Sequence, residues 1–330
     1  MAEYGVQVST PTTLEQAADT LRTWALDEGL KAQVMASPTL ARMAKTIARR
    51  YIAGETITDA VEAAGAGMRR GHLPSIEYTG ESVRDAQLAR SETDVFLKLI
   101  TAVRESGLPS TISFDLSHIG SIVDPALALA HVREMSQASA DLGTGLMISA
   151  ERSDRTDLVL DLHDELAGEH PHLGITLQAR LHRTPADLDR VLRHPGTVRL
   201  VKGAFLESEQ VAYRRGSDEL TLAYLALAER LIESGHSVSL ATHDEILVQA
   251  LIAEHGSLLA QDHVEFEMLL GLGTELLDDL HRQGFRTREY VIFGAEWWLY
   301  VLNRMAEHPD RVIAALGDLN PEVGLVPHER

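Results

Sequence analysis

Charged and small residues occur together in the stretch VRLVKGAFLESE (198–209), which begins as a β-type run. Arg199 and Lys202 would point to opposite faces if one strand continued through both, because successive strand side chains alternate. If the strand ends just before Lys202, that side chain is free to turn toward the strand end. Gly203 and Ala204 then allow a ligand to approach the backbone closely. Two cations beside such a loop suit an anionic group or an electron-rich heterocycle, and a strand-end salt bridge is the structural alternative.

Polar side chains recur at the ends of the other β-type runs, where packing alone would favour apolar residues. This pattern is the first sign of a binding site, because loops that follow strands carry the chemistry in many α/β folds. The positions are Asp115, Ser149, Gln178, Lys202, Thr242 with His243, and Glu267, together with the apolar Phe293 at the last strand end.

The elements that must position these side chains follow a regular order. Residues before about 70 read as helices by their 3.6-residue apolar spacing, at 13–26, 30–52 and 58–68. From residue 75 on, short β-rich runs alternate with amphipathic stretches. The runs are 75–78, 111–115, 146–150, 175–178, 198–202, 237–242, 264–268 and 290–293. The helices between and after them are expected at 125–135, 154–166, 185–192, 209–234, 245–255, 274–283 and 296–307.

Strands that alternate with helices indicate βαβ units and a parallel sheet, and eight of them favour a closed barrel. An open doubly wound sheet is the alternative, but no glycine-rich dinucleotide fingerprint follows any of the strands. We therefore predict an α/β protein with a (β/α)8 TIM-type barrel in residues 73–330. Residues 1–72 are expected to form an N-terminal helical segment that packs on the barrel.

Composition excludes several classes of function. The formal charge of −19 argues against a nucleic-acid partner and against adhesion to anionic lipid. The absence of cysteine excludes disulfides, thiolate nucleophiles and cysteine-based metal sites. The N-terminus has no apolar signal region, and no run approaches the ~20 apolar residues of a membrane span. We therefore expect a cytoplasmic protein without integral membrane association.

The stretch 198–209 resembles the fifth barrel strand of proline dehydrogenases. Other segments agree with that family in order and spacing, and together they span residues 75–309. The resemblance implies a distorted (β/α)8 barrel with non-covalent FAD and an eighth helix over the barrel mouth. The agreeing segments are SIEYTGESV (75–83, with Glu81 in its turn), ITLQARLHRT (175–184), SLATHDE (239–245), VEFEMLLG (264–271) and YVIFGAEWWLYVLNRMAEHP (290–309).

The resemblance also implies a set of residues that hold FAD. A flavin needs donors near N5, N1 and O2, where negative charge develops on reduction. Arg199 would serve the isoalloxazine, whereas Lys202, Thr242 and His243 would serve the ring edge, ribityl chain or phosphates. His243 could instead bond a backbone carbonyl, and Glu307 could be an ordinary surface acid. The matching positions are Gln178, Arg199, Lys202, Thr242, His243 and Glu307, with Gly203 beside them.

The substrate side of the sequence departs from the family pattern. The family binds the proline carboxylate with two consecutive arginines on helix 8 and a lysine at the end of strand 2. Here the pair reads Asn303–Arg304, and Asp115 stands where the lysine belongs. Ser149 replaces an acid typical of strand 3, and Tyr300 matches the tyrosine that stacks on the substrate ring.

These replacements make the predicted substrate pocket about three charge units more negative, of which Ser149 returns at most one. Arg304 alone could still hold a carboxylate through two hydrogen bonds. Asp115 could receive an ammonium, hydrazinium or hydroxyl group that proline lacks. Its structural alternative is a local hydrogen bond to Ser117 or His118, or an ion pair with Arg180.

Three functions follow from these residues. The first is an FAD-dependent oxidoreductase that transfers a hydride to FAD N5 from a proline-like amine, or from another amino or N–N-containing small molecule. The second is L-proline dehydrogenase, which produces pyrroline-5-carboxylate. The third is a flavin-binding or non-catalytic scaffold or regulatory protein. For the enzyme, the electron acceptor is expected to be a quinone or oxygen.

Overall fold

The computed structural model describes residues 13–80, 82–142, 145–309, 311–317 and 319. The chain forms two compact units. One comprises residues 53–295, and the other comprises residues 1–52 together with 296–330. The predicted boundary at residue 72 stays a prediction.

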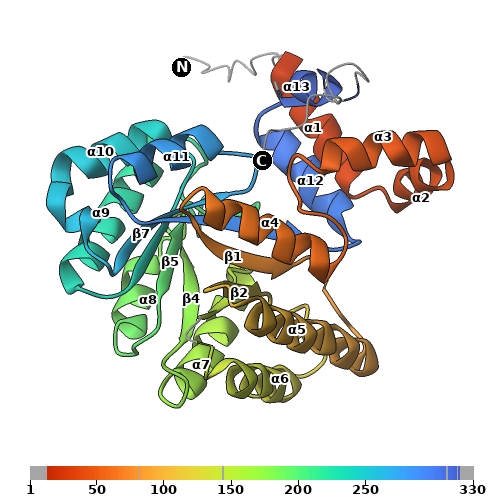
Figure 1. Cartoon of the computed structure of the whole chain (residues 1–330). Coiled ribbons are helices and arrows are strands. Elements are labelled where there is room, and N and C mark those ends of the chain that lie inside the picture. The colour runs from red at the N-terminus through yellow and green to blue at the C-terminus, as the bar shows by residue number, and fades with distance from the viewer. Residues whose placement is uncertain (1–12, 81, 143–144, 310, 318, 320–330) are drawn as a thin grey trace, which may run out of the picture. The chain divides into compact units, whose positions relative to one another are not determined.

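The larger unit is built on a closed barrel of parallel strands, in which each strand pairs with the next and β8 returns to β1 (Figure 1). Closure is direct, since Ile76 of β1 is the register partner of both Ile112 and Val291. The predicted α/β barrel is therefore confirmed, and each of the eight predicted strands is present. They are β1 (Leu73–Tyr78), β2 (Thr111–Phe114), β3 (Leu146–Ile148), β4 (Leu173–Gln178), β5 (Val198–Val201), β6 (Val238–Ala241), β7 (Val264–Leu269) and β8 (Thr287–Phe293).

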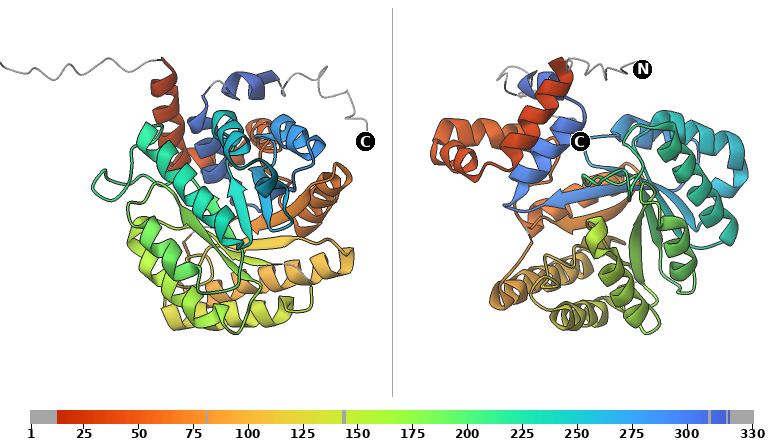
Figure 2. Two further views of the ribbon diagram at one scale, coloured as in Figure 1. Left: turned by 90° about the vertical axis from the view of Figure 1, so that its left-hand side faces the viewer. Right: turned by 180° about the vertical axis from the view of Figure 1, so that it is seen from behind.

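Helices surround the strands and cover their outward faces (Figure 2). Most of the outward residues are apolar, and Ile76, Ile112 and Phe114 are fully buried against this helical layer. One further helix, α4, lies against β1 and β8. The hydrophobic core therefore sits between sheet and helices. The helices of this unit are α4 (Ile57–Arg69), α5 (Ala86–Ser106), α6 (Pro125–Ser139), α7 (Thr156–Ala167), α8 (Thr184–Val191), α9 (Asp218–Ser234), α10 (Glu245–His255) and α11 (Thr274–Arg282).

Helix α5 is absent from the predicted segments, although its ends carry clear local signals. The Asp85 side chain accepts the Leu88 N–H at 2.8 Å, which caps the first turn. Gly107 closes the helix with φ +67°, a left-handed conformation that glycine adopts without steric cost. Phe96 and Leu99 lie on the buried face between these ends.

The inward faces of the strands are polar, unlike the branched apolar layers usual in such barrels. At the amino-terminal end, Arg288 Nε donates to Glu265 Oε1 at 2.5 Å and Nη2 donates to Oε2 at 3.0 Å. Arg288 also donates to the Pro74 carbonyl. Both charged side chains are less than a tenth exposed. This pair therefore holds β7, β8 and β1 together from inside the barrel.

The smaller unit is helical in the part that the structure describes. Helices α1 (Thr13–Ala25) and α12 (Trp297–Glu307) pack along each other, and Trp298 Nε1 donates to the Trp24 carbonyl at 2.9 Å. Lys31 and Glu296 add an ion pair at 2.6 Å. The unit is completed by α2 (Glu28–Ala36), α3 (Pro38–Ala48) and α13 (Arg311–Gly317).

Two predicted helices differ from those observed. The segment expected at 30–52 is two helices, because Ser37 ends α2 and caps α3 while Pro38 occupies the first turn of α3. The helix expected at 209–234 begins only at Asp218, where the Ser217 side chain accepts the Leu220 N–H. Gly216 precedes this cap with φ +71°. The residues from 202 to 217 form a loop instead.

The buried Glu265–Arg288 pair yields a stability prediction. Glu265→Gln leaves the Arg288 charge uncompensated inside the barrel, which costs about 3–5 kcal/mol of unfolding free energy. The control is Glu165→Gln, which breaks the half-exposed pair with Arg133 at 3.5 Å and costs less than about 1 kcal/mol. Urea unfolding followed by circular dichroism measures both. Equal losses for the two variants would contradict the structural role of the buried pair.

Candidate active site

The predicted residues of the barrel unit gather at the carboxyl ends of its strands. Asp115 follows β2, Gln178 ends β4, and Arg199 lies within β5. Lys202 and Gly203 follow β5, while Thr242 and His243 follow β6. Because all strands are parallel, these ends share one mouth of the barrel. The structure thus brings seven predicted residues to one end of one unit: Asp115, Gln178, Arg199, Lys202, Gly203, Thr242 and His243.

Arg199 crosses the interior of the barrel and is only 4% exposed. Its Nε donates to Glu267 Oε2 at 2.6 Å, and its Nη2 donates to Glu267 Oε1 at 2.8 Å. Nη1 donates to Ser113 Oγ and Nη2 to Ser75 Oγ, each at 3.0 Å. A guanidinium has five N–H donors, so one Nη1 hydrogen has no partner among the described residues. The guanidinium carbon also lies 4.7 Å from the Tyr290 ring centroid.

The Glu267 side chain is as buried and as fully hydrogen-bonded as the Arg199 side chain with which it pairs. It is 2% exposed, and Ser239 Oγ donates to its Oε2 at 2.6 Å. Both carboxylate oxygens therefore accept hydrogen bonds from fixed donors on β5 and β6. The pair with Arg199 is one form of the strand-end salt bridge that the sequence left open as a structural alternative.

A group of carboxyl side chains lies at the ends of β1, β2 and β3. Ser149 Oγ donates to Glu77 Oε2 at 3.2 Å, and the nearby Ser149 hydroxyl also lowers the pKa of Asp115. Burial raises the pKa of Glu77 to about 7, against the nearby Arg199, which lowers it. Burial and the charges of Glu77 and Glu151 raise the pKa of Asp115 well above its ordinary value. Each of these carboxyl groups therefore keeps its proton to a higher pH than an exposed acid does.

Glu77 is absent from the predicted site. The signal that identifies it is the alternation of Ser75 and Glu77 in β1, because polar residues two apart lie on the same face of a strand.

Two of the partners considered for Asp115 in the sequence bond other groups in the structure. Arg180 donates to the backbone carbonyls of Phe205 and Tyr213. His118 Nε2 lies 2.7 Å from Glu92.

Lys202 and His243 also have protein partners. Strand β5 ends at Val201, so Lys202 is free to turn, and its Nζ donates to Asp244 Oδ2 at 2.5 Å. Both side chains of this pair are 34% exposed. His243 Nε2 accepts the Leu269 N–H at 2.9 Å, so Nδ1 carries the proton of the neutral ring. This is a backbone contact, but it is made to an N–H rather than to a carbonyl.

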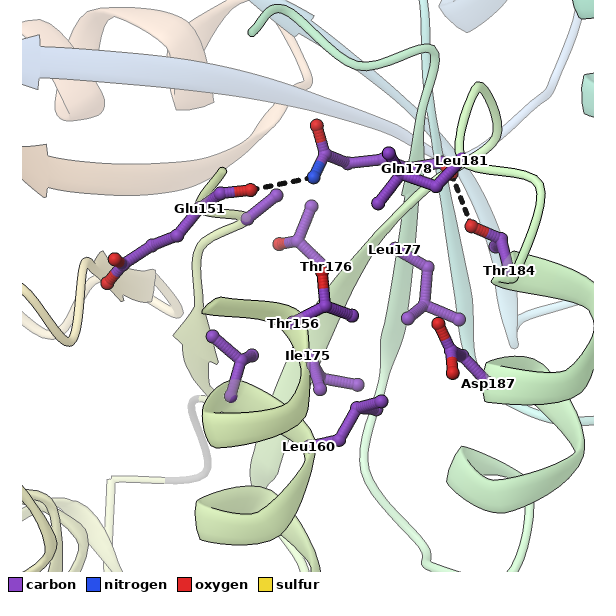
Figure 3. Close-up of a pocket in the computed structure, with 12 residues that line it drawn as sticks. Glu151, Thr156, Leu160, Ile175, Thr176, Leu177, Gln178, Leu181, Thr184 and Asp187 are labelled. Carbon is purple, nitrogen blue, oxygen red and sulfur yellow. Dashed lines mark hydrogen bonds between the residues drawn. The ribbon is translucent and has the colours of Figure 1, made fainter. Parts of the chain in front are cut away.

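The loop after β5 packs closely on the end of β4. A Cβ atom on Gly203, which has φ +108°, would lie 2.8 Å from the Arg180 side chain and 3.1 Å from Gln178 Oε1. Only glycine suits this position without strain. Gln178 Nε2 donates to the Glu151 carbonyl at 2.8 Å, and its Oε1 points away from Glu151 (Figure 3). That buried Oε1 has no partner among the described residues.

The cavity drawn in Figure 3 lies beside β4, with α7 and α8 contributing to its lining. Its lining includes Thr176 and Gln178 together with apolar side chains such as Leu160 and Leu177. The volume is about 20 Å³, which holds roughly one water molecule. The cavity is therefore too small for a substrate or a flavin.

The remaining predicted residues lie on α12, in the smaller unit. Arg304 Nη2 pairs with Glu307 Oε1 at 2.8 Å, one helical turn away. The Arg304 guanidinium carbon lies 5.6 Å from the Tyr300 ring centroid. Asn303 directly precedes Arg304 and is half-buried. The structure brings Tyr300, Arg304 and Glu307 together along one helix, whereas Glu81 lies outside the described residues.

Sequence comparison identifies the family of this barrel. A family model described as proline dehydrogenase matches residues 60–307, which is most of the chain. The chain belongs to the proline dehydrogenase family. Proline dehydrogenase 1 of Bacillus subtilis is 32% identical over 281 residues, covering 82% of this chain and 91% of the relative. Proline dehydrogenase of Deinococcus radiodurans is 31% identical over 271 residues, covering 80% and 86%.

A solved structure carries the same fold. Proline utilization A from Bdellovibrio bacteriovorus, inactivated by N-propargylglycine, superposes with a TM-score of 0.75 at 18% identity. The match covers 94% of this chain but only 38% of that longer chain. As a proline dehydrogenase family member, the chain is an oxidoreductase, and the family is flavin-dependent in general.

Glu77 yields a prediction that requires no ligand. A rise of its pKa from 4.5 to about 7 corresponds to about 3 kcal/mol. A raised folded-state pKa contributes stability below the unfolded value, and this stability is lost as pH rises through 7. Glu77→Gln mimics the protonated acid, so the variant should exceed the wild type in stability by up to about 3 kcal/mol at pH 8. The difference should vanish near pH 4.5.

Urea unfolding at several pH values, followed by circular dichroism, measures this difference. Tryptophan fluorescence is unsuitable, because Trp24, Trp297 and Trp298 all lie in the smaller unit. Glu165→Gln, on the surface of the same barrel unit, serves as the control and should show no such pH dependence. A Glu77→Gln variant no more stable than the wild type at pH 8 would contradict burial of an ionised carboxylate.

Proposed function

We propose that the chain is an FAD-dependent dehydrogenase that oxidises the C–N bond of proline or a proline-like amine. The observation that carries the proposal is the charged barrel interior at the carboxyl-terminal mouth. Arg199 and the carboxyl groups of Glu151 and Glu267 are buried there, in the part of such barrels where substrates and cofactors bind. Burying unneeded charge is costly, so this concentration favours a functional role over a structural one. The names of the relatives supply the substrate class.

The residues at the mouth fit a flavin in three respects. Gln178 Oε1 is a buried acceptor without a partner among the described residues, and the flavin ring has N–H groups to offer it. Arg199 retains one unpartnered Nη1 hydrogen among those residues, and a flavin has acceptors at N1, O2 and N5. Gly203 exposes its backbone where a side chain would not fit.

We therefore assign the hold on FAD to the strand-end residues of the barrel, and a role for Glu307 of α12 stays a prediction. Arg199 and Gln178 serve the ring, while Lys202, Thr242 and His243 serve the ribityl chain or phosphates. When bound, FAD supplies the acceptor for the hydride that leaves the carbon next to the amine nitrogen. The protein's own contribution is to orient the amine, exclude water and receive the proton that the nitrogen releases.

Glu77, in its ionised form, is the group that can accept that proton. Its pKa is raised to about 7, and Ser149 Oγ donates to its Oε2 at 3.2 Å. A carboxyl that titrates near neutral pH is suited to proton exchange with an amine. On α12, we assign recognition of the substrate ring to Tyr300. Arg304 binds the carboxylate there, and Asn303 is its neutral neighbour.

The electron acceptor and location follow from the same proposal. A quinone or oxygen would reoxidise the enzyme, and no partner nucleic acid is expected for so acidic a chain. None of the described helices has the length and apolar character to cross a membrane. The cytoplasmic location stays a prediction.

The first test of the proposal is spectroscopic. The purified protein should be yellow, or become so with FAD, and anaerobic L-proline should bleach the flavin band. Prolinamide, which lacks the carboxylate, should bleach it far less readily if Arg304 binds that group. A yellow protein that L-proline leaves oxidised would point to another amine, which the same assay can identify. A protein that binds no FAD would favour the scaffold reading and end this proposal.

Asp115 provides a second, pH-dependent prediction. Its ionised form repels the substrate carboxylate, so Asp115→Asn should lower the KM for L-proline by about tenfold at pH 9. Because the pKa of Asp115 is raised, its protonated fraction grows as the pH falls, and the difference should be smaller at pH 6. Asp262→Asn is the matched control, because Asp262 is exposed and precedes the amino end of β7. A KM ratio that does not change between pH 6 and pH 9 would contradict this assignment.

A further inference from the structure

The pairing of Arg199 with Glu267 has a consequence for a cofactor at the barrel mouth. A flavin gains negative charge when it is reduced, so a nearby guanidinium favours the reduced form. A carboxylate bonded to that guanidinium reduces its effect, because the two charges largely cancel at a distance. Glu267 meets Arg199 through two hydrogen bonds of 2.6 and 2.8 Å, where Arg199 is only 4% and Glu267 only 2% exposed. The compensation is therefore built into the barrel.

We propose that Glu267 is a positioning residue that sets the reduction potential of the flavin by partly neutralising Arg199. This inference rests on the proposed function, since it assumes that FAD binds at the mouth. Glu267 acts through Arg199, whose remaining Nη1 hydrogen is the group available to a ligand. Glu267 itself is occupied by Arg199 and Ser239 and is 2% exposed.

The hydrogen bonds around the pair support tuning rather than simple anchoring. Ser75 and Ser113 already fix the guanidinium at 3.0 Å each, from β1 and β2. Tyr290 packs against its face. A barrel that needed only to orient Arg199 could do so with these neutral groups. The added carboxylate contributes charge, and Ser239 modulates that charge by donating to Glu267 Oε2 at 2.6 Å.

The experiment measures the midpoint potential of the FAD-loaded protein against a reference dye at pH 6. Glu77 also lies near Arg199, and Glu267 raises its pKa. Removing Glu267 therefore promotes ionisation of Glu77, and pH 6 keeps that compensation small. Glu267→Gln should shift the equilibrium toward reduced flavin by tenfold or more, which is about 30 mV for a two-electron couple.

Two further variants separate charge from structure. Glu267→Asp keeps the charge and should stay within about threefold of the wild-type equilibrium. Ser239→Ala removes the donor that offsets the Glu267 charge, so it should shift the equilibrium the opposite way, by about two- to fivefold. A residue that merely held the fold would give no such sign reversal.

The outcomes divide clearly. A Glu267→Gln protein that binds FAD with an unchanged or lowered potential overturns the inference and leaves the proposed function intact. If that variant does not fold or load FAD, Ser239→Ala decides, because the ion pair remains in it. An unchanged potential in Ser239→Ala would then overturn the inference. A wild-type protein that binds no FAD removes the proposed function, and the inference fails with it.

Discussion

The buried ion pair between Arg199 and Glu267 is the interaction on which the carboxyl-terminal half of the barrel depends. An isolated charge in so dry an interior is costly, so each residue of the pair lowers the cost of burying the other. Their hydrogen bonds reach β1, β2, β6 and β7 as well as β5. The contacts that join the strands also fix the position of the Arg199 guanidinium. The same hydrogen bonds therefore serve both the stability of the barrel and the proposed chemistry.

The charged residues inside the barrel form two groups, one near the amino-terminal end of the strands and one nearer the mouth. Near the amino-terminal end, Glu265 pairs with Arg288 and also accepts from Arg286 Nε at 3.3 Å, and these contacts hold strands together. Nearer the mouth, Glu77 and Asp115 lack such full compensation, and burial raises the pKa of each. Uncompensated polar groups are costly to the fold and useful to a ligand. Their concentration at one end is the physical reason to place chemistry there.

The substrate question depends on these same acids. Membership of the proline dehydrogenase family gives the reaction type, whereas we propose that Asp115 alters the charge that a substrate carboxylate meets. Protonation of Glu77 or Asp115 then changes that charge without any change of sequence. In this proposal, the preference for proline over another amine depends on protonation as well as on residue identity.

Local pattern in the sequence determined the order of the strands, most helix positions and the residues at the strand ends. The pattern did not predict where α3 and α9 begin, because one side-chain hydrogen bond, at the caps Ser37 and Ser217, decides the start of each helix. It could not find the partners of Arg199 and Lys202, since Glu267 lies 68 residues and Asp244 lies 42 residues away along the chain. Only closure of the barrel brings those groups within bonding distance. The sequence determines which residue types lie on which strands. The tertiary structure determines which of these residues pair, how deeply they are buried and how they are protonated.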